Sequence, residues 1–376
     1  MLLAYIKINN IETAAFCCVF FMHKNSFIFI YFLTLKYIFI TLLTRGSMLN
    51  YSKVIKSSKA YKTIDLDISG SRLSHAYLFM SADDNYLKAF SELVCKRFIT
   101  MSEPEEKIEA IENRIEKCVH PDVKIFGEDK NIDVKITEEI LEEVTFSPFE
   151  ADKKIYVLAN VQNMNDASQN KILKTIEEPP KNTFFILTCN SISKLLQTIL
   201  SRVKKIELDK LTEKDIQSML KEKGVDDDKS EILASCSNGN GKFAEKLALD
   251  DGFISFYNDI VSMLFEINGS RDVLKYSNLF SAKNVDKNEF FDIVIVVLRD
   301  VMMLNVGKEQ MISSKSIITK LKMVASMLNI TSITELISKC LECKKKLAFN
   351  VNSTAVIDEF LFKLAEVKVK CRRLQA

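Results

Sequence analysis

The chain is expected to be an α/β protein in its first half and all-helical in its second, on three observations. Short apolar runs without strict polar alternation are separated by helical stretches, as in a parallel sheet covered by helices on both faces. All five prolines lie at or before Pro180, and proline is the strongest helix breaker. Beyond it, apolar residues recur at helical spacing, as at Phe290, Ile293 and Val297.

The composition is that of a soluble globular protein with two or three domains, since 47% of the 376 residues are hydrophobic and 27% are charged. The net charge of +2 means that any contact with DNA would need a local basic patch. The nine cysteines show no framework spacing, which favours a reducing cytosol. Cys340 and Cys343 form a single Cys-x-x-Cys pair, and ordinary buried thiols are favoured over a redox or metal role.

Residues 1–47 form an apolar extension that we expect to result from a mis-set translation start. Arg45-Gly46 before Met48 is what a purine-rich ribosome-binding site yields when read in frame, and the apolar residues resemble translated AT-rich spacer. A membrane anchor remains an alternative, because residues 26–44 approach the ~20 apolar residues of a span, although Lys36 interrupts them. A signal peptide is disfavoured by the lack of a clear small-x-small cleavage site.

Residues 48–208 are expected to form the α/β part. The double proline at Pro179-Pro180 should end the helix before the fourth strand. Strands are predicted at Ala76–Met80, Asp122–Phe126, Lys154–Leu158, Thr183–Thr188 and Val203–Leu208, and helices at 83–99, 105–117, 137–146 and 166–178.

Two helical parts should follow. In the first, residues 209–252, Thr212-x-x-Asp215 resembles a capping box and Gly224 would end that helix. Residues 253–376 are predicted to form a helical bundle.

The first phosphate-binding element of a nucleotide-hydrolysing fold is missing. A P-loop after the first strand needs glycines, a lysine and a hydroxyl. From Ser81 to Lys88 there is no glycine; Leu87 holds the lysine position and Lys88 the hydroxyl position. Asp83 and Asp84 would repel a polyphosphate. Lys88 is therefore interpreted as a lone surface lysine.

The second element, an acidic pair that holds magnesium at the end of a buried strand, is also missing. After the strand at 154–158 the sequence continues with Ala159-Asn160, so both carboxylates are absent. With both elements degenerate, the chain is not expected to hydrolyse ATP.

Several segments resemble one family. From Met48 to its end the chain is similar to the delta prime subunit of the bacterial DNA polymerase III clamp loader, a member of the AAA+ class, most strongly over 150–208. The resemblance implies an AAA+ α/β domain (48–208), a helical lid (209–252) and a helical collar (253–376) that oligomerises. The segments that carry it are His75–Phe79, His120–Asp122, Asn170–Pro180, Leu195–Arg202 and Leu347–Asn352.

The resemblance implies a role in DNA replication. In this family the assembly is a five-subunit ring, which opens a sliding clamp and loads it on primer–template DNA. This chain would be a subunit of a DNA-directed DNA polymerase (nucleotidyltransferase) holoenzyme, beside motor and delta subunits. It would have no cofactor of its own, because ATP and magnesium are bound by the neighbouring subunit. The expected location is the cytoplasm, with the nucleoid-associated replication machinery.

The resemblance also assigns a role to Ser201-Arg202, which match the Ser-Arg-Cys motif of the family, with Val203 in place of cysteine. Arg202 would be an arginine finger acting in trans on the neighbour's ATP. A guanidinium presents a charged planar fork to phosphate oxygens, which suits that role. The alternative is a solvated arginine near the start of a strand.

Other positions that match the family pattern are given no functional role. Asn190, where the family has a nucleotide sensor, is interpreted as a structural loop residue, and Lys242, at a second sensor position, as a helix-start lysine. The zinc module of the family is not expected here, because Cys95, Cys118 and even His120 fall short of four ligands.

Two other functions remain open on the sequence. An ATPase motor subunit of a clamp loader is opposed by the empty phosphate positions, and ATP binding would decide. An AAA+-like regulator anchored to the membrane through residues 26–44 would be separated by fractionation of the native protein.

Overall fold

The computed structural model describes residues 49–70, 72–282, 286–312, 317–349 and 351–375. The apolar extension and the expected start at Met48 lie outside these ranges, so the competing interpretations of residues 1–47 stay predictions. Across the described ranges, no helix is both long and apolar enough to cross a membrane.

A five-stranded parallel sheet forms the first half of the described chain, with the strand order β2-β3-β4-β1-β5. Leu78 of β1 pairs with Leu187 of β4 on one side and with Lys205 of β5 on the other. All five predicted strands are confirmed to within one residue at each end. Their bounds are β1 Ala76–Met80, β2 Val123–Phe126, β3 Lys154–Leu158, β4 Thr183–Cys189 and β5 Lys204–Glu207.

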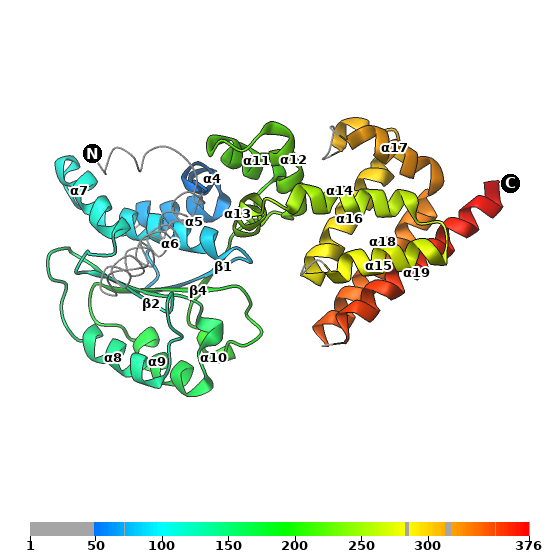
Figure 1. Ribbon diagram of the computed structural model, residues 1–376. Coiled ribbons are helices and arrows are strands. Elements are labelled where there is room, and N and C mark those ends of the chain that lie inside the picture. The colour runs from blue at the N-terminus through cyan, green and yellow to red at the C-terminus, as the bar shows by residue number, and fades with distance from the viewer. Residues whose placement is uncertain (1–48, 71, 283–285, 313–316, 350, 376) are drawn as a thin grey trace, which may run out of the picture. The chain divides into compact units, whose positions relative to one another are not determined.

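Helices cover both faces of the sheet (Figure 1). Alternate residues of β1 separate the faces: Tyr77 and Phe79 belong to the core beneath α6, whereas Ala76 and Leu78 belong to the core beneath α8, α9 and α10. This explains why the strands are apolar on both sides. The helices are α4 Ser52–Ser57, α5 Lys59–Ser69, α6 Asp84–Thr100, α7 Glu105–Glu116, α8 Val134–Val144, α9 Asp166–Glu177 and α10 Gln197–Leu200.

Local capping sets the ends of these helices. Helix α8 begins three residues before its predicted start, because the Asp133 side chain accepts a hydrogen bond from the N–H of Ile136. Helix α9 ends at Glu177, just before the two prolines, as predicted. Helices α4 and α5 were not predicted; the Ser58 side chain caps α5 by accepting from Tyr61 N.

Three short helices follow the sheet: α11 Glu213–Glu222, α12 Asp227–Cys236 and α13 Gly241–Leu249. The predicted capping box is confirmed, since Thr212 and Asp215 exchange side chain to backbone bonds in both directions. Gly224 follows the end of α11 with a φ of +83°, which glycine adopts without strain.

From Phe253 onward, the described residues form a helical bundle, as predicted. Phe290, Ile293 and Val297 of α16 are all buried in its core. Cys340 and Cys343 of α18 are buried too, and burial raises the pKa of both thiols. The helices are α14 Phe253–Glu266, α15 Ser270–Ala282, α16 Lys287–Asn305, α17 Ile318–Met327, α18 Ile330–Ala348 and α19 Ser353–Gln375.

The fold class, a parallel α/β domain followed by helices, is therefore confirmed. The domain boundaries at 208/209 and 252/253 fall between elements and stay predictions.

Candidate functional site

The place of a phosphate cradle, between β1 and α6, is occupied by a buried carboxylate. Asp83 is 2% exposed and caps α6, because its Oδ1 accepts a hydrogen bond from Tyr86 N at 3.1 Å. A helix N-terminus attracts negative charge, which in nucleotide-binding folds is often a phosphate. Here the negative charge belongs to the chain itself.

The same carboxylate also reaches the start of α13, more than 150 residues away in sequence. Asp83 Oδ2 accepts hydrogen bonds from Gly241 N at 2.6 Å and Lys242 N at 3.3 Å, and the Tyr51 hydroxyl lies 3.5 Å from it. One side chain therefore serves the N-termini of two helices. We call this arrangement of Asp83, Gly241 and Lys242 the carboxylate clasp.

Further polar contacts surround the clasp. Lys242 Nζ lies 2.6 Å from Asp84 Oδ2, and the Asn240 amide donates to the carbonyl of Ala82 at 3.0 Å. Asn85 donates to Glu245 of α13 at 2.7 Å. The residues that stand where a P-loop would be are thus bonded to the start of α13.

Burial and hydrogen bonding act in opposite directions on Asp83. Burial raises the pKa of its carboxyl, and the backbone N–H groups of Tyr86, Gly241 and Lys242 lower it; the net pKa lies above the ordinary value. The carboxylate has three backbone donors, as a buried ionised group requires.

The residues predicted to form a degenerate phosphate site between β1 and α6 make other contacts or are buried. Ser81 accepts from Asp83 N at 3.2 Å, and Leu87, at the lysine position, is buried. Lys88 pairs with Glu128 at 2.7 Å, on the surface, with its side chain 41% exposed. None of these side chains offers a donor to phosphate in the way a P-loop lysine does.

At the end of β3, Ala159 and Asn160 stand where the acidic pair would be. Asn160 has a left-handed backbone with φ of +56°; its N–H donates to Thr188 Oγ1 and its amide to the carbonyl of Gly127, both at 3.2 Å. Asparagine tolerates this conformation better than most residues. The side chain is therefore engaged in holding the strand end.

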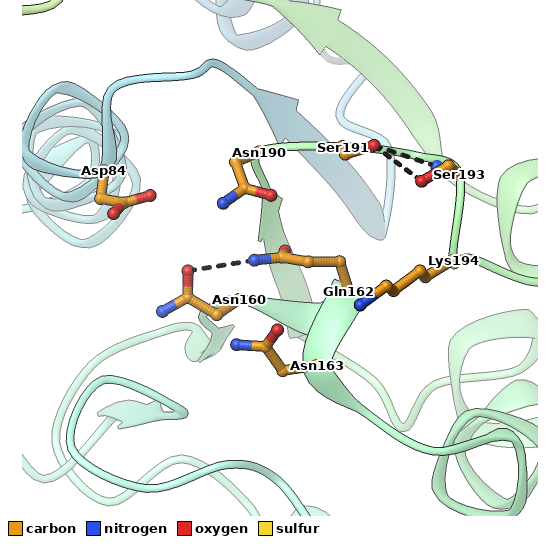
Figure 2. Close-up of a pocket in the computed structure, with 8 residues that line it drawn as sticks. All are labelled: Asp84, Asn160, Gln162, Asn163, Asn190, Ser191, Ser193 and Lys194. Atoms are coloured by element: carbon orange, nitrogen blue, oxygen red, sulfur yellow. Dashed lines mark hydrogen bonds between the residues drawn. The ribbon is translucent and has the colours of Figure 1, made fainter. Parts of the chain in front are cut away.

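A polar pocket of about 410 Å³ opens beside these residues, where β3 and β4 end (Figure 2). It contains one carboxylate and one ammonium group, and that carboxylate, Asp84, is already paired with Lys242. No pair of carboxylates faces it, so it lacks the magnesium ligands expected at this place. The lining residues are Asp84, Asn160, Gln162, Asn163, Asn190, Ser191, Ser193 and Lys194.

Arg202 lies apart from this pocket, two residues after α10. Its Nε is 3.0 Å from Glu177 Oε2, and its Nη1 donates to the carbonyl of Thr198 at 3.0 Å. Its side chain is 33% exposed, and Nη2 makes no hydrogen bond to any described residue. Ser201 donates its hydroxyl to the same Thr198 carbonyl at 3.0 Å. The pair therefore sits on the surface, away from the chain's own pocket.

The structure shows where the other residues singled out in the sequence lie, and their predicted roles stay predictions. Lys242 is at the start of α13, as expected, and Asn190 follows β4. His120 is held by Asp122 N and Glu150, while Cys95 is buried and Cys118 exposed. Among the described residues, no three His, Cys, Asp or Glu side chains are grouped to hold a metal.

Sequence reasoning missed the role of Asp83, which it treated only as a charge that repels phosphate. The one local signal was its position before an apolar helical run, typical of an N-cap. Nothing in the sequence indicates its second partner at Gly241, because that contact is made by the tertiary structure.

Two family descriptions match most of the described chain. Residues 56–212 match the family described as DNA polymerase III, delta subunit, and residues 253–366 match the one described as DNA polymerase III, delta subunit, C terminal.

Individual relatives agree with these matches. The delta prime subunit of DNA polymerase III from Bacillus subtilis is 27% identical over 315 residues, which covers 81% of this chain and 94% of that protein. The tau subunit from Bacillus subtilis is 26% identical, covering 57% of this chain and 39% of its own length. The gamma subunit from Buchnera aphidicola subsp. Schizaphis graminum is 29% identical, covering 53% and 57%.

Solved structures show weaker similarity. A gamma subunit-related protein of DNA polymerase III from Thermotoga maritima matches with a TM-score of 0.40 and 15% identity, covering 81% of this chain and 99% of that one. The clamp loader delta protein of Bacillus subtilis gives 0.30 and 13%, with the same coverage.

Proposed function

The chain belongs to the delta prime family of DNA polymerase III clamp-loader subunits, and we propose that it binds and hydrolyses no ATP itself but lends Arg202 to the ATP of a neighbouring subunit. The observation that carries this proposal is the carboxylate clasp. A fixed, buried negative charge occupies the place where the first half of a phosphate site would be.

The clasp disfavours nucleotide in two ways. The Asp83 carboxylate repels a polyphosphate at short range, in an environment that screens charge poorly. It also engages the N–H groups at the starts of α6 and α13, which are the groups best suited to bind an anion. Ala159 and Asn160 supply no carboxylate for magnesium.

Arg202 is suited to act on another subunit. It is on the surface, its guanidinium is always charged, and part of its planar fork is unengaged. An arginine supplied in trans stabilises the charge that develops on a transferred phosphoryl group, an effect of roughly 10³–10⁵ in rate in other phosphoryl-transfer systems. ATP and Mg²⁺ would both belong to the neighbour.

The proposed setting is the replication machinery. The relatives are named as subunits of DNA polymerase III, which supports assembly with other such subunits. Within it, the chain would join motor and delta subunits through residues 253–376 and help to load a sliding clamp on primer–template DNA. The proposed location is the cytoplasm, at the nucleoid.

The experiment is a measurement of Mg-ATP binding and steady-state hydrolysis by the isolated chain, with a motor subunit as the positive control. We expect neither binding nor hydrolysis above background. The matched variant is Lys88→Ala, which removes the lysine nearest the P-loop position. Hydrolysis that Lys88→Ala abolishes would contradict the proposal and support a motor-type ATPase.

A further inference from the structure

We infer that Glu177 is a positioning residue for Arg202: its carboxylate fixes the plane of the guanidinium so that the free side of the fork faces outward. This inference rests on the proposed role of Arg202, and it assigns to Glu177 a function beyond ending α9 at the double proline.

Helix α9 holds the arginine-bearing segment first through Gln169. This side chain is fully buried; its Nε2 donates to the carbonyls of Met164 and Lys194, both at 3.0 Å, and its Oε1 accepts from Leu196 N at 2.9 Å. The chain is therefore fixed to α9 just before α10 begins.

Helix α10 connects this fixed segment to Arg202. Ile199 and Leu200 are buried against α9 and the sheet, and Arg202 N donates to the carbonyl of Ile199 at 2.9 Å. The backbone of Arg202 is thereby placed, whereas its long side chain would still sample many rotamers without a partner.

Glu177 supplies that partner from the last turn of α9. With Nε bonded to Glu177 and Nη1 to the carbonyl of Thr198, the guanidinium is held on two sides. The N–H groups of a guanidinium form a rigid planar fork, so two such hydrogen bonds from different nitrogens set its orientation. The remaining nitrogen, Nη2, stays available for a phosphate oxygen.

The charge of Glu177 acts against this benefit, because a carboxylate beside the guanidinium weakens its attraction for an anion. The pair is partly exposed, with Glu177 at 55% and Arg202 at 33%, so water and salt screen this penalty. The benefit of a fixed orientation of the Arg202 guanidinium should therefore be larger than the penalty from the charge of Glu177. The two effects can be separated, since glutamine at position 177 keeps the acceptor oxygen and removes the charge.

The test uses the clamp loader reconstituted with the other subunits of the same organism, with clamp and primed DNA present. Glu177→Ala should lower kcat for ATP about tenfold, with KM nearly unchanged, because a misplaced catalytic group costs rate more than binding. Glu177→Gln should recover most of the loss. Glu178→Ala removes the same charge from the adjacent, exposed position and should match the unmutated complex.

Two results would overturn the inference: Glu177→Ala behaving as Glu178→Ala does, or Glu177→Ala raising kcat, which would make Glu177 a restraint. In both cases a loss of activity in Arg202→Ala would leave the proposed function standing. If Arg202→Ala has no effect, the proposed function fails. Thermal unfolding of each variant distinguishes lost positioning from lost folding.

Discussion

The carboxylate clasp around Asp83 and the surface around Arg202 lie in the same α/β domain, yet they differ in burial and in what their charged side chains contact. At the first, Asp83 is 2% exposed and bonded to the starts of two helices. At the second, Arg202 is one-third exposed and retains an unengaged nitrogen among the described residues.

The difference separates a charge that is used within the fold from a charge that is available to a partner. A charge satisfied inside the protein contributes to the fold and is unavailable to a ligand. A charge held at the surface contributes little to stability and remains available to a partner. We therefore expect mutations at the clasp to change the free energy of unfolding, whereas mutations at Arg202 should change only the activity of the complex.

The largest effect on stability is expected from Asp83→Ala. It removes the cap of α6 and leaves Gly241 N and Lys242 N without their acceptor. The free energy of unfolding of the isolated chain, measured in urea, should therefore fall by about 2–4 kcal/mol. Asp84→Ala, which breaks only an exposed ion pair with Lys242, should cost less than about 1 kcal/mol. Equal losses would show that the clasp is not structural.

A smaller loss is expected from Gly241→Ala. A Cβ at this position would lie 2.5 Å from the Tyr51 hydroxyl and 3.1 Å from Asp83 Oδ2, so the clasp must shift. We expect a cost of about 1–2 kcal/mol by the same urea unfolding, although alanine is otherwise the better helix former. At Gly269 a Cβ meets nothing within 4 Å, and Gly269→Ala should be neutral. A neutral Gly241→Ala would contradict the geometry of the clasp.

The smallest effect is a pH dependence at Asp83. Because its pKa is raised, the folded state binds this proton more tightly than the unfolded state does. The unmutated chain should therefore gain stability relative to Asp83→Asn as pH falls from the raised pKa through the ordinary aspartate value of about 3.9. Urea unfolding of both proteins across this range measures the difference, and an opposite slope would show that hydrogen bonding outweighs burial.

The sequence predicted what is encoded locally. Strands such as Lys154–Leu158 are continuous apolar runs because both faces are buried, and the double proline marks the end of α9. The capping box at Thr212 and the helix end near Gly224 were predicted for the same reason.

The sequence could not predict contacts that join distant segments. Asp83 meets Gly241 across the fold, and Gln169 of α9 bonds to the turn before α10. The lack of glycine from Ser81 to Lys88 can be read from the sequence, but the contacts that Asp83 makes in this segment depend on packing. The partner of Arg202 at Glu177 was likewise hidden, because the two residues approach only once the sheet has formed.

The central claim is that this chain contributes an arginine to a nucleotide that it does not bind. The most direct test is ATP turnover by the reconstituted complex, with clamp and primed DNA, when the chain carries Arg202→Ala. We expect the free energy of unfolding of the isolated variant to lie within about 0.5 kcal/mol of that of the unmutated chain. The variant should also assemble normally. Stimulated hydrolysis should fall by about 10³-fold or more, and Arg202→Lys should restore little of it. An assembled Arg202→Ala complex that hydrolyses ATP and loads clamps at the unmutated rate would contradict the account.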